Sequence, residues 1–172
     1  GDNEVFPGTI WTGTLNGKIV IFEPQEPDAV TFPFRINAGG PELTHSGDLF
    51  LADQYFVNGA DFSNTSALVP PLFQTEHTSS QPAFDYQIPI PNGNYEVVLH
   101  FAEIYWGATG GGAGGVGSRI FDVNIEGTLV LDNYDIIADV GSETPVAKMF
   151  NVTVTDGNLD INFSSLPATG GV

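Results

Sequence analysis

The residues of this chain that could do chemistry include 21 carboxylates, three histidines and the adjacent aromatic side chains of Tyr105 and Trp106. The aromatic pair ends a predicted core strand and is followed directly by a glycine-rich stretch, residues 107–117. Aromatic side chains that carry a polar atom are enriched at binding sites, because they present an apolar face together with a hydrogen-bonding tip. The pair therefore indicates a binding site at the end of this strand.

The carboxylates and histidines show no catalytic or metal-binding pattern. Two carboxylates flanking a glycosidic bond would make a glycosidase, but chance pairs are expected in a chain with 21 acidic residues. His45, His77 and His100 lie on separate segments without metal-ligand spacing, and they give no Ser-His-Asp arrangement. We therefore predict no catalytic residues, no enzyme activity, no metal site and no cofactor. A structural calcium ion stays an open alternative at three groups of aspartates: Asp48 with Asp53, Asp132 with Asp135 and Asp139, and Asp156 with Asp160.

Composition limits the class of protein. The 172 residues are enough for one domain, 41% of them are hydrophobic, and there is no cysteine for disulfides. The net charge of -17, with only 4 Lys and Arg residues, excludes binding to nucleic acid or to an anionic membrane surface, because both need clustered cations. No apolar run is long enough for membrane insertion. These features favour an acidic, secreted or cell-surface protein.

Alternation of apolar and polar residues at period two predicts six strands in three hairpins. The hairpins comprise residues 84–90 with 95–101, residues 121–125 with 128–131, and residues 150–154 with 159–163. Turn sequences separate the two strands of each pair, as in Asp156-Gly157-Asn158. No segment shows a convincing helical period. The sequence therefore predicts an all-β fold, an antiparallel β-sandwich of jelly-roll type.

The chain divides at a proline-rich, acidic segment. Residues 1–29 are predicted as an N-terminal extension with one strand, at Lys18–Phe22, and a linker over residues 23–28. Residues 30–172 are predicted as the β-sandwich domain. Within it, residues 42–81 show little periodicity and are expected to form a long loop region. The glycine-rich residues 107–117 are expected to form a flexible rim beside Tyr105.

A series of short motifs gives the chain a family resemblance. In order they are Ile36-Asn37-Ala38-Gly39-Gly40, Gln74-Thr75-Glu76, Tyr86-Gln87-Ile88-Pro89-Ile90, Gly93-Asn94-Tyr95, His100-Phe101-Ala102-Glu103-Ile104-Tyr105-Trp106, Phe121-Asp122-Val123, Gly127, Asp135-Ile136 and Val140-Gly141. This combination, over roughly Phe34 to Phe163, resembles malectin domains, and in particular the bacterial carbohydrate-binding modules of that family. The resemblance implies a malectin-like, galactose-binding-domain-like jelly roll without catalytic activity.

The resemblance also implies a sugar site. Members of the family hold sugars with aromatic side chains, and two of those positions fall at Tyr105 and Trp106, whereas Thr78 stands where another aromatic is usual. The candidate polar contacts to sugar hydroxyls are Asn37, Glu76, His77 and Glu103. The expected function is a non-catalytic carbohydrate-binding module of a secreted or cell-surface protein. Its expected partner is an oligo- or polysaccharide stacked on the aromatic pair.

The end of the family pattern raises an alternative function. A late aspartate of the family lies in a last strand that this sequence does not reach before Val172, so that strand is expected to be missing. Leu15–Phe22 is good strand sequence outside the family core. We expect it to fill the gap, in its own chain or in a neighbour's by strand donation. The alternative is therefore a structural module of an extracellular surface layer or filament that associates with itself or with neighbouring domains.

Overall fold

The computed structural model describes residues 10–13, 19–22 and 32–165, and the chain forms two units, Gly1–Val30 and Thr31–Val172. In the first unit, strands β1 (Ile10–Gly13) and β2 (Ile19–Phe22) form an antiparallel hairpin. The strand predicted at Lys18–Phe22 corresponds to β2, and β1 is an additional strand that the sequence analysis missed. The predicted linker over residues 23–28 lies outside the described residues.

The main sheet of the second unit has five strands in the order β12-β11-β14-β9-β6. Their bounds are β12 (Thr128–Tyr134), β11 (Phe121–Ile125), β14 (Asn158–Ser165), β9 (Ala83–Pro89) and β6 (Phe56–Val57). All neighbouring strands are antiparallel. Alternate apolar side chains from the central strands, such as Phe84, Val123 and Ile161, are buried on one face and form the core.

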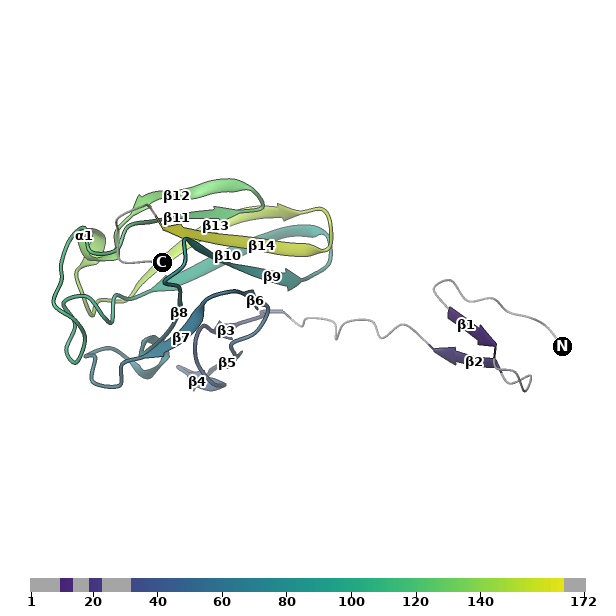
Figure 1. Ribbon diagram of the computed structural model, residues 1–172, viewed down its shortest axis with the longest axis horizontal. Helices are drawn as coiled ribbons and strands as arrows, with labels where there is room; N and C mark the ends of the chain where they lie inside the picture. The colour runs from purple at the N-terminus through teal and green to yellow at the C-terminus, as the bar shows by residue number, and fades with distance from the viewer. Residues whose placement is uncertain (1–9, 14–18, 23–31, 166–172) are drawn as a thin grey trace. The chain divides into compact units, whose positions relative to one another are not determined.

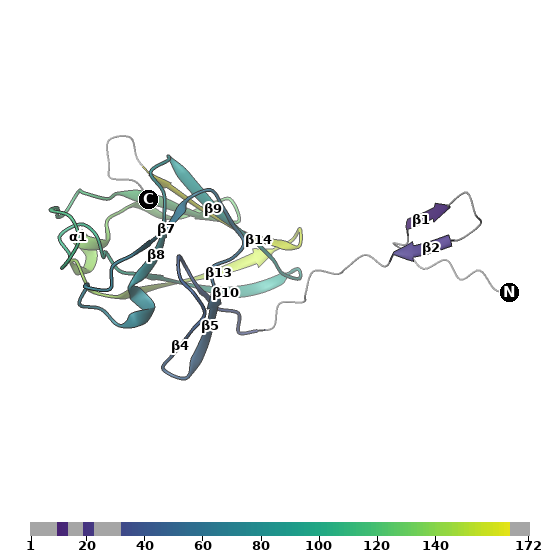
Figure 2. The ribbon, with the colours of Figure 1, turned by 60° about the horizontal axis from the view of Figure 1, so that its bottom comes forward.

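The second layer is a ladder of two long antiparallel strands, β10 (Gly93–Phe101) and β13 (Val146–Val154). It lies across the core from the main sheet, as Figures 1 and 2 show. Phe101 of β10 packs against Phe121 and Tyr134 of the main sheet, with ring centroids 5.8 and 5.5 Å apart. Two layers joined by interleaved side chains make a β-sandwich, so the predicted fold class is confirmed.

Two of the three predicted hairpins are wrong in their pairing. β9 pairs with β14 and β6, whereas β10 pairs with β13. β13 and β14 likewise belong to different sheets. Alternation identifies the inward face of a strand but not its hydrogen-bonding partner. The inward faces of β9 and β10, and those of β13 and β14, meet across the core instead of lying in one sheet. Only the hairpin of β11 and β12, which turns at Glu126-Gly127, is confirmed among the three.

The predicted loop region over residues 42–81 is also wrong, because it contains several short strands. These are β4 (Leu43–His45), β5 (Asp48–Ala52), β6, β7 (Ala60–Ser63) and β8 (Thr75–Thr78), with a 3-10 turn, η1, at Pro71–Phe73. β3 (Ile36–Asn37) adds a parallel neighbour to β5, β4 pairs antiparallel with β5, and β7 pairs antiparallel with β8. Strands of two to five residues are too short to show a clear alternation.

Within the described residues one short α-helix interrupts the β architecture, although no segment of the sequence shows a convincing helical period. Helix α1 (Ile136–Val140) is capped by Asp135, whose side chain accepts a hydrogen bond from the Ala138 N–H. It ends at Gly141, which adopts a positive φ of 87°. No helix in the described part of the chain is long and apolar enough to cross a membrane.

Candidate functional site

Tyr105 is the exposed member of the predicted aromatic pair. The segment after β10 leaves the core at Ile104, which is 0% exposed, and Tyr105 next to it is 37% exposed. Its ring meets Phe62 and Trp106 edge-on, at centroid distances of 5.6 and 4.7 Å. Trp106 is half-buried, and a side chain at Gly114 would collide with its indole. Tyr105 therefore keeps part of its ring exposed, and the half-buried Trp106 packs against it.

The glycine-rich segment is a hydrogen-bonded loop that packs against the aromatic pair, and its composition alone had indicated a flexible rim. Gly107 donates its N–H to the carbonyl of Gly112, and Gly112 donates to the carbonyl of Tyr105, both at 2.8 Å. A Cβ atom at Gly111 would lie on the carbonyl oxygen of Tyr105, and one at Gly112 would lie 2.9 Å from its ring. The glycines are therefore required for close approach of the loop to Tyr105.

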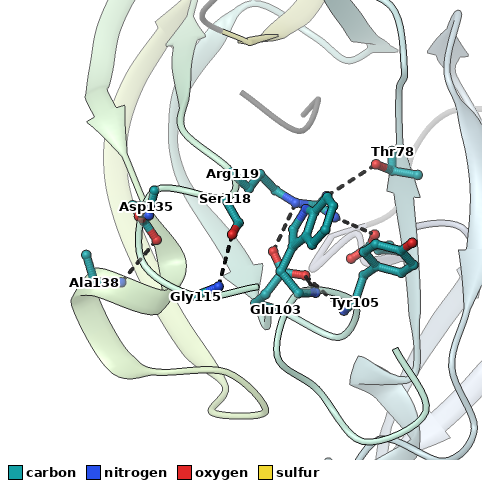
Figure 3. A network of polar contacts seen from close by, with 11 residues as sticks. Thr78, Glu103, Tyr105, Gly115, Ser118, Arg119, Asp135 and Ala138 are labelled. Atoms are coloured by element: carbon teal, nitrogen blue, oxygen red, sulfur yellow. Dashed lines mark hydrogen bonds and ion pairs between the residues drawn. The ribbon is translucent and has the colours of Figure 1, made fainter. Parts of the chain in front are cut away.

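Glu103 fixes the backbone of the aromatic pair. Its Oε1 accepts hydrogen bonds from the N–H groups of Tyr105 at 2.9 Å and Trp106 at 3.0 Å. Its Oε2 lies 2.9 Å from Arg119 Nε, an ion pair whose N–H is not aligned as a hydrogen bond. Glu103 is only 1% exposed. The carboxylate of Glu103, a predicted contact to sugar, is thus occupied by the Tyr105 and Trp106 N–H groups and by Arg119, and Figure 3 shows it between Tyr105 and Arg119.

Arg119 connects this backbone support to strand β8. Its guanidinium lies 3.3 Å from Glu76 Oε1 and donates a hydrogen bond of 3.2 Å to Thr78 Oγ1, and Figure 3 shows it extending between Glu103 and Thr78. Arg119 was not among the residues predicted from the sequence. The available signal was its rarity, because Lys and Arg together number 4 in the chain. A buried guanidinium in so acidic a protein needs carboxylate partners, and here it has two.

Glu76 lies on the Tyr105 side of β8. It is the register partner of Phe62, whose ring contacts Tyr105, and its side chain is 16% exposed. Burial raises the pKa of Glu76 to about 7; the Arg119 charge acts against this rise and the Glu103 carboxylate adds to it. Near neutral pH this carboxyl group can therefore donate or accept a hydrogen bond.

Asn37 and His77 lie on the opposite face of β8 from Glu76, because neighbouring residues of a strand point to opposite sides. Thr75, which shares the His77 face, donates a 3.0 Å hydrogen bond to Asn37 Oδ1. The Asn37 amide donates to the carbonyl of Pro41 at 2.8 Å, and Asn37 is buried. Of the six predicted contacts, the structure therefore brings together Tyr105, Trp106, Glu76 and Glu103, and it separates Asn37 and His77 from them.

His77 is the centre of a second buried network. Its Nδ1 lies 2.9 Å from Asp53 Oδ2 and 3.0 Å from Asp61 Oδ1, and its Nε2 lies 2.9 Å from the carbonyl of Asn58. All three partners are acceptors, so both ring nitrogens carry protons. Burial alone would lower the pKa of His77, but the hydrogen bonds to Asp53, Asn58 and Asp61 raise it. Asp53, Asp61 and His77 are close enough together to hold a metal ion, but a protonated imidazole accounts for the same geometry.

Two hollows on the described surface lie away from Tyr105. One, of about 240 Å³, is on the outer face of the main sheet, and the other, of about 260 Å³, is on the outer face of β10 and β13. The first is lined by Asp85, Tyr86, Gln87, Asn124, Gly127, Asp160, Ile161 and Asn162. Solvated outer faces of sheets account for both. The candidate site is thus a surface around one exposed ring and not a deep pocket.

Comparisons with known proteins agree on one family. A family model described as the malectin domain matches residues 32–170. A probable LRR receptor-like serine/threonine-protein kinase of Arabidopsis thaliana is 37% identical over 113 residues, which are 64% of this chain and 11% of that protein. Human malectin is 30% identical over 100 residues, which are 58% of this chain and 32% of malectin. The chain therefore spans about a third or less of the length of these relatives.

A solved structure shows the same fold. Bacteroides uniformis beta-glucuronidase 2, covalently bound to cyclophellitol-6-carboxylate aziridine, superposes with a TM-score of 0.64 at 21% identity. The match covers 91% of this chain and 20% of that one. The predicted resemblance to malectin domains is confirmed by the family match. The predicted bacterial type stays a prediction, because similar chains come from a plant, an animal and a bacterium.

Proposed function

Because the chain belongs to the malectin domain family, we propose that it is a non-catalytic carbohydrate-binding module of a secreted or cell-surface protein. A sugar ring of an oligo- or polysaccharide stacks on Tyr105, with Trp106 behind it. Glu76 contacts the sugar hydroxyls, and Glu103 and Arg119 position these groups without touching the ligand. The module contributes binding and no catalytic step.

The observation that carries this proposal is the exposed ring of Tyr105 on a fixed support. Its backbone is held by Glu103, and its ring is held between Phe62 and Trp106. A ligand face that is already ordered loses little conformational entropy on binding. The indole N–H of Trp106 adds support, because it is buried without an acceptor in the described chain. Buried N–H groups nearly always have a partner, and a ligand oxygen could supply one here.

The charges around Tyr105 favour uncharged glycans over acidic ones. Glu76 and Glu103 outnumber the single Arg119, whose guanidinium is already shared between them. The whole chain carries a net charge of -17. A sugar carboxylate or sulfate would therefore meet repulsion both at long range and in the site.

A glycan array followed by calorimetric titration of the best ligand tests the proposal. Tyr105→Ala should weaken binding at least about tenfold because the stacking face is lost, and Tyr105→Phe should keep most of it. Phe32→Ala is the matched control, since Phe32 is 53% exposed and stacks on Tyr95, outside the site. If the folded protein binds no glycan at millimolar concentration, or if Tyr105→Ala binds as tightly as the unaltered chain, the proposal is wrong.

The second candidate function is a structural module completed by strand donation. The observation that favours it is the incomplete second layer. Within residues 32–165, β10 has β13 as its one strand partner, and the inward side chains of Tyr95, Leu99 and Phe101 are only half-buried. An open strand edge beside a partly exposed core can accept another strand. β2 is the predicted donor, although its backbone already pairs with β1.

Light scattering of the full chain from micromolar to millimolar concentration separates the two candidates. Strand donation predicts oligomers that grow with concentration. Val20→Pro, which removes a backbone donor from β2, should abolish them. A protein that stays monomeric throughout this range contradicts strand donation between copies and leaves the carbohydrate proposal unaffected.

A further inference from the structure

Glu143 joins two loops that are distant in the sequence. It lies in the connection between α1 and β13. Its Oε1 accepts hydrogen bonds from the N–H groups of Leu68 at 2.7 Å and Thr109 at 3.1 Å. Its Oε2 accepts one from the hydroxyl of Thr109 at 3.2 Å. One carboxylate thus holds the loop that contains Leu68 and the glycine-rich loop, residues 107–117, against its own segment.

The backbone of Glu143 is itself held in an unfavourable conformation. Its φ is 57°, in the left-handed region that residues with a side chain rarely adopt. Its N–H donates a 3.0 Å hydrogen bond to the carbonyl of Glu103, the residue that fixes Tyr105. Such conformations persist only where the surroundings impose them, and they are concentrated at functional sites. The strained backbone of Glu143 is therefore hydrogen-bonded directly to Glu103, the residue that fixes the backbone of Tyr105.

The two loops also contact each other, next to the aromatic pair. The buried amide of Asn64 donates to the carbonyls of Ile104 at 2.7 Å and Thr109 at 2.8 Å. A Cβ atom at Gly110 would lie 2.7 Å from the Cβ of Ser66. The glycine-rich loop packs on Tyr105. A movement of either loop would therefore change the residues that contact the Tyr105 ring.

We propose that Glu143 is a positioning residue of the candidate site, a clasp that keeps both loops ordered against Tyr105. The consequence for sugar affinity rests on the proposed carbohydrate-binding function, whereas the order of the loops does not. Without the clasp, the loops must be ordered when the ligand binds, and that entropy cost lowers the affinity. The geometry also explains the direction of the Glu143 pKa, which the N–H groups of Leu68 and Thr109 and the Thr109 hydroxyl hold below its usual range.

Hydrogen exchange of the Leu68 and Thr109 amides in the full chain, read by NMR, tests the clasp without any ligand. Glu143→Ala removes the acceptor of both amides, so their exchange should become at least about tenfold faster. Glu143→Gln should rescue protection to within about threefold, since its carbonyl oxygen can accept both N–H groups. Glu96→Ala is the control, because Glu96 is an exposed carboxylate on the outer face of β10. It should leave both amides unchanged.

Titration of the three variants with the best array glycan then tests positioning. We expect Glu143→Ala to weaken binding about tenfold while Glu143→Gln and Glu96→Ala bind like the unaltered chain. Unchanged exchange at Leu68 and Thr109 in Glu143→Ala overturns the clasp. Faster exchange with unchanged affinity overturns the positioning role. If the unaltered chain binds no glycan, the proposed function fails by itself, and the exchange measurement still decides whether Glu143 orders the loops.

Discussion

Arg119 Nε lies 2.9 Å from Glu103 Oε2, and the other oxygen of that carboxylate holds the N–H groups of Tyr105 and Trp106. A single buried ion pair therefore connects strand β8, through Glu76 and Thr78, to the backbone of the exposed ring. The side chains of Arg119 and Glu103 are 10% and 1% exposed. For a pair buried this deeply, removing one partner costs more stability than the intact pair contributes, because the other charge is left buried without a counter-charge.

The first prediction is that Arg119→Met destabilises the fold by about 3–5 kcal/mol, because it leaves the Glu103 carboxylate buried and unpaired beside Glu76. Urea unfolding followed by circular dichroism measures this. The control is Arg35→Met. Arg35 pairs with Asp48 at 3.0 Å, but the two side chains are 29% and 54% exposed, so the loss should be below about 1 kcal/mol. Equal losses in the two variants would contradict the structural role of Arg119.

The second prediction concerns Glu76 and pH. Burial raises its pKa in the folded state to about 7 from the usual glutamate value of 4.5, so the folded protein binds more protons than the unfolded chain between these values. The free energy of unfolding should therefore fall as the pH rises from about 5 to 8, by on the order of 2–3 kcal/mol at most. Glu76→Gln has no titrating group there, so it should lose this part of the pH dependence.

Urea unfolding of both proteins at pH 5, 6, 7 and 8 supplies the measurement. Glu96→Gln is the matched control, because Glu96 is exposed on the outer face of β10. Its curve should parallel that of the unaltered chain. A Glu76→Gln curve with the same slope as the unaltered chain would show that Glu76 is ionised in the folded protein already at pH 5.

The strand faces could be predicted from sequence, and the pairing could not. Phe84 and Tyr86 alternate with polar residues and are buried, because period-two alternation directly encodes the inward face of a strand. Nothing in that alternation distinguishes a hairpin from a crossover between layers, so β9 and β10 were paired wrongly. Strand pairing depends on how the whole chain packs, which a local pattern does not contain.

In the candidate site, too, local sequence signals could be predicted and long-range contacts could not. Tyr105 and Trp106 could be predicted, because two adjacent aromatics at the end of a core strand are a local signal. Arg119 and Glu143 could not, because their partners lie 16 or more residues away in the chain, on other segments of the fold. His77 and Glu76 were both predicted as polar contacts to sugar, yet neighbours on a strand face opposite ways, so the two side chains lie on different faces of β8.

The third prediction is that His77 and His100 titrate on opposite sides of the usual histidine pKa of about 6.5. Burial lowers the pKa of His77, but hydrogen bonds to Asp53, Asn58 and Asp61 raise it above that value. His100 has no such acceptors among the described residues, and burial and the His45 charge lower its pKa. A pH titration of the ring carbon signals by NMR gives both values, and Asp61→Asn should bring the His77 value down while leaving His100 unchanged.

His77 should also contribute to stability in a defined pH range. Because its pKa is raised on folding, the contribution is fully present below the unfolded pKa and is lost as the pH rises through the folded one. The free energy of unfolding of His77→Gln should therefore approach that of the unaltered chain toward alkaline pH. A difference between the two proteins that is constant from pH 5 to 9 would contradict a protonated, acceptor-bound imidazole.

The fourth prediction separates a lost hydrogen bond from a misplaced charge at Asn64. Its buried amide donates to the carbonyls of Ile104 and Thr109, and its Oδ1 accepts from the Ser66 N–H at 3.1 Å. Asn64→Ala leaves both carbonyls unpaired, so it should cost about 2–4 kcal/mol at every pH. In Asn64→Asp a carboxylate oxygen would face those two carbonyls, so burial and repulsion should raise the pKa of the new carboxyl group.

A raised carboxyl pKa gives Asn64→Asp a pH-dependent stability that Asn64→Ala lacks. The protonated carboxyl can donate to one of the carbonyls, so the variant should be most stable near pH 4 and should lose stability as the pH rises through its folded pKa. Urea unfolding at pH 4 and pH 8, with the unaltered chain as the reference for the effect of Glu76, measures the difference. If Asn64→Asp and Asn64→Ala shift in parallel between these pH values, the Asn64 side chain is not aimed at the two carbonyls.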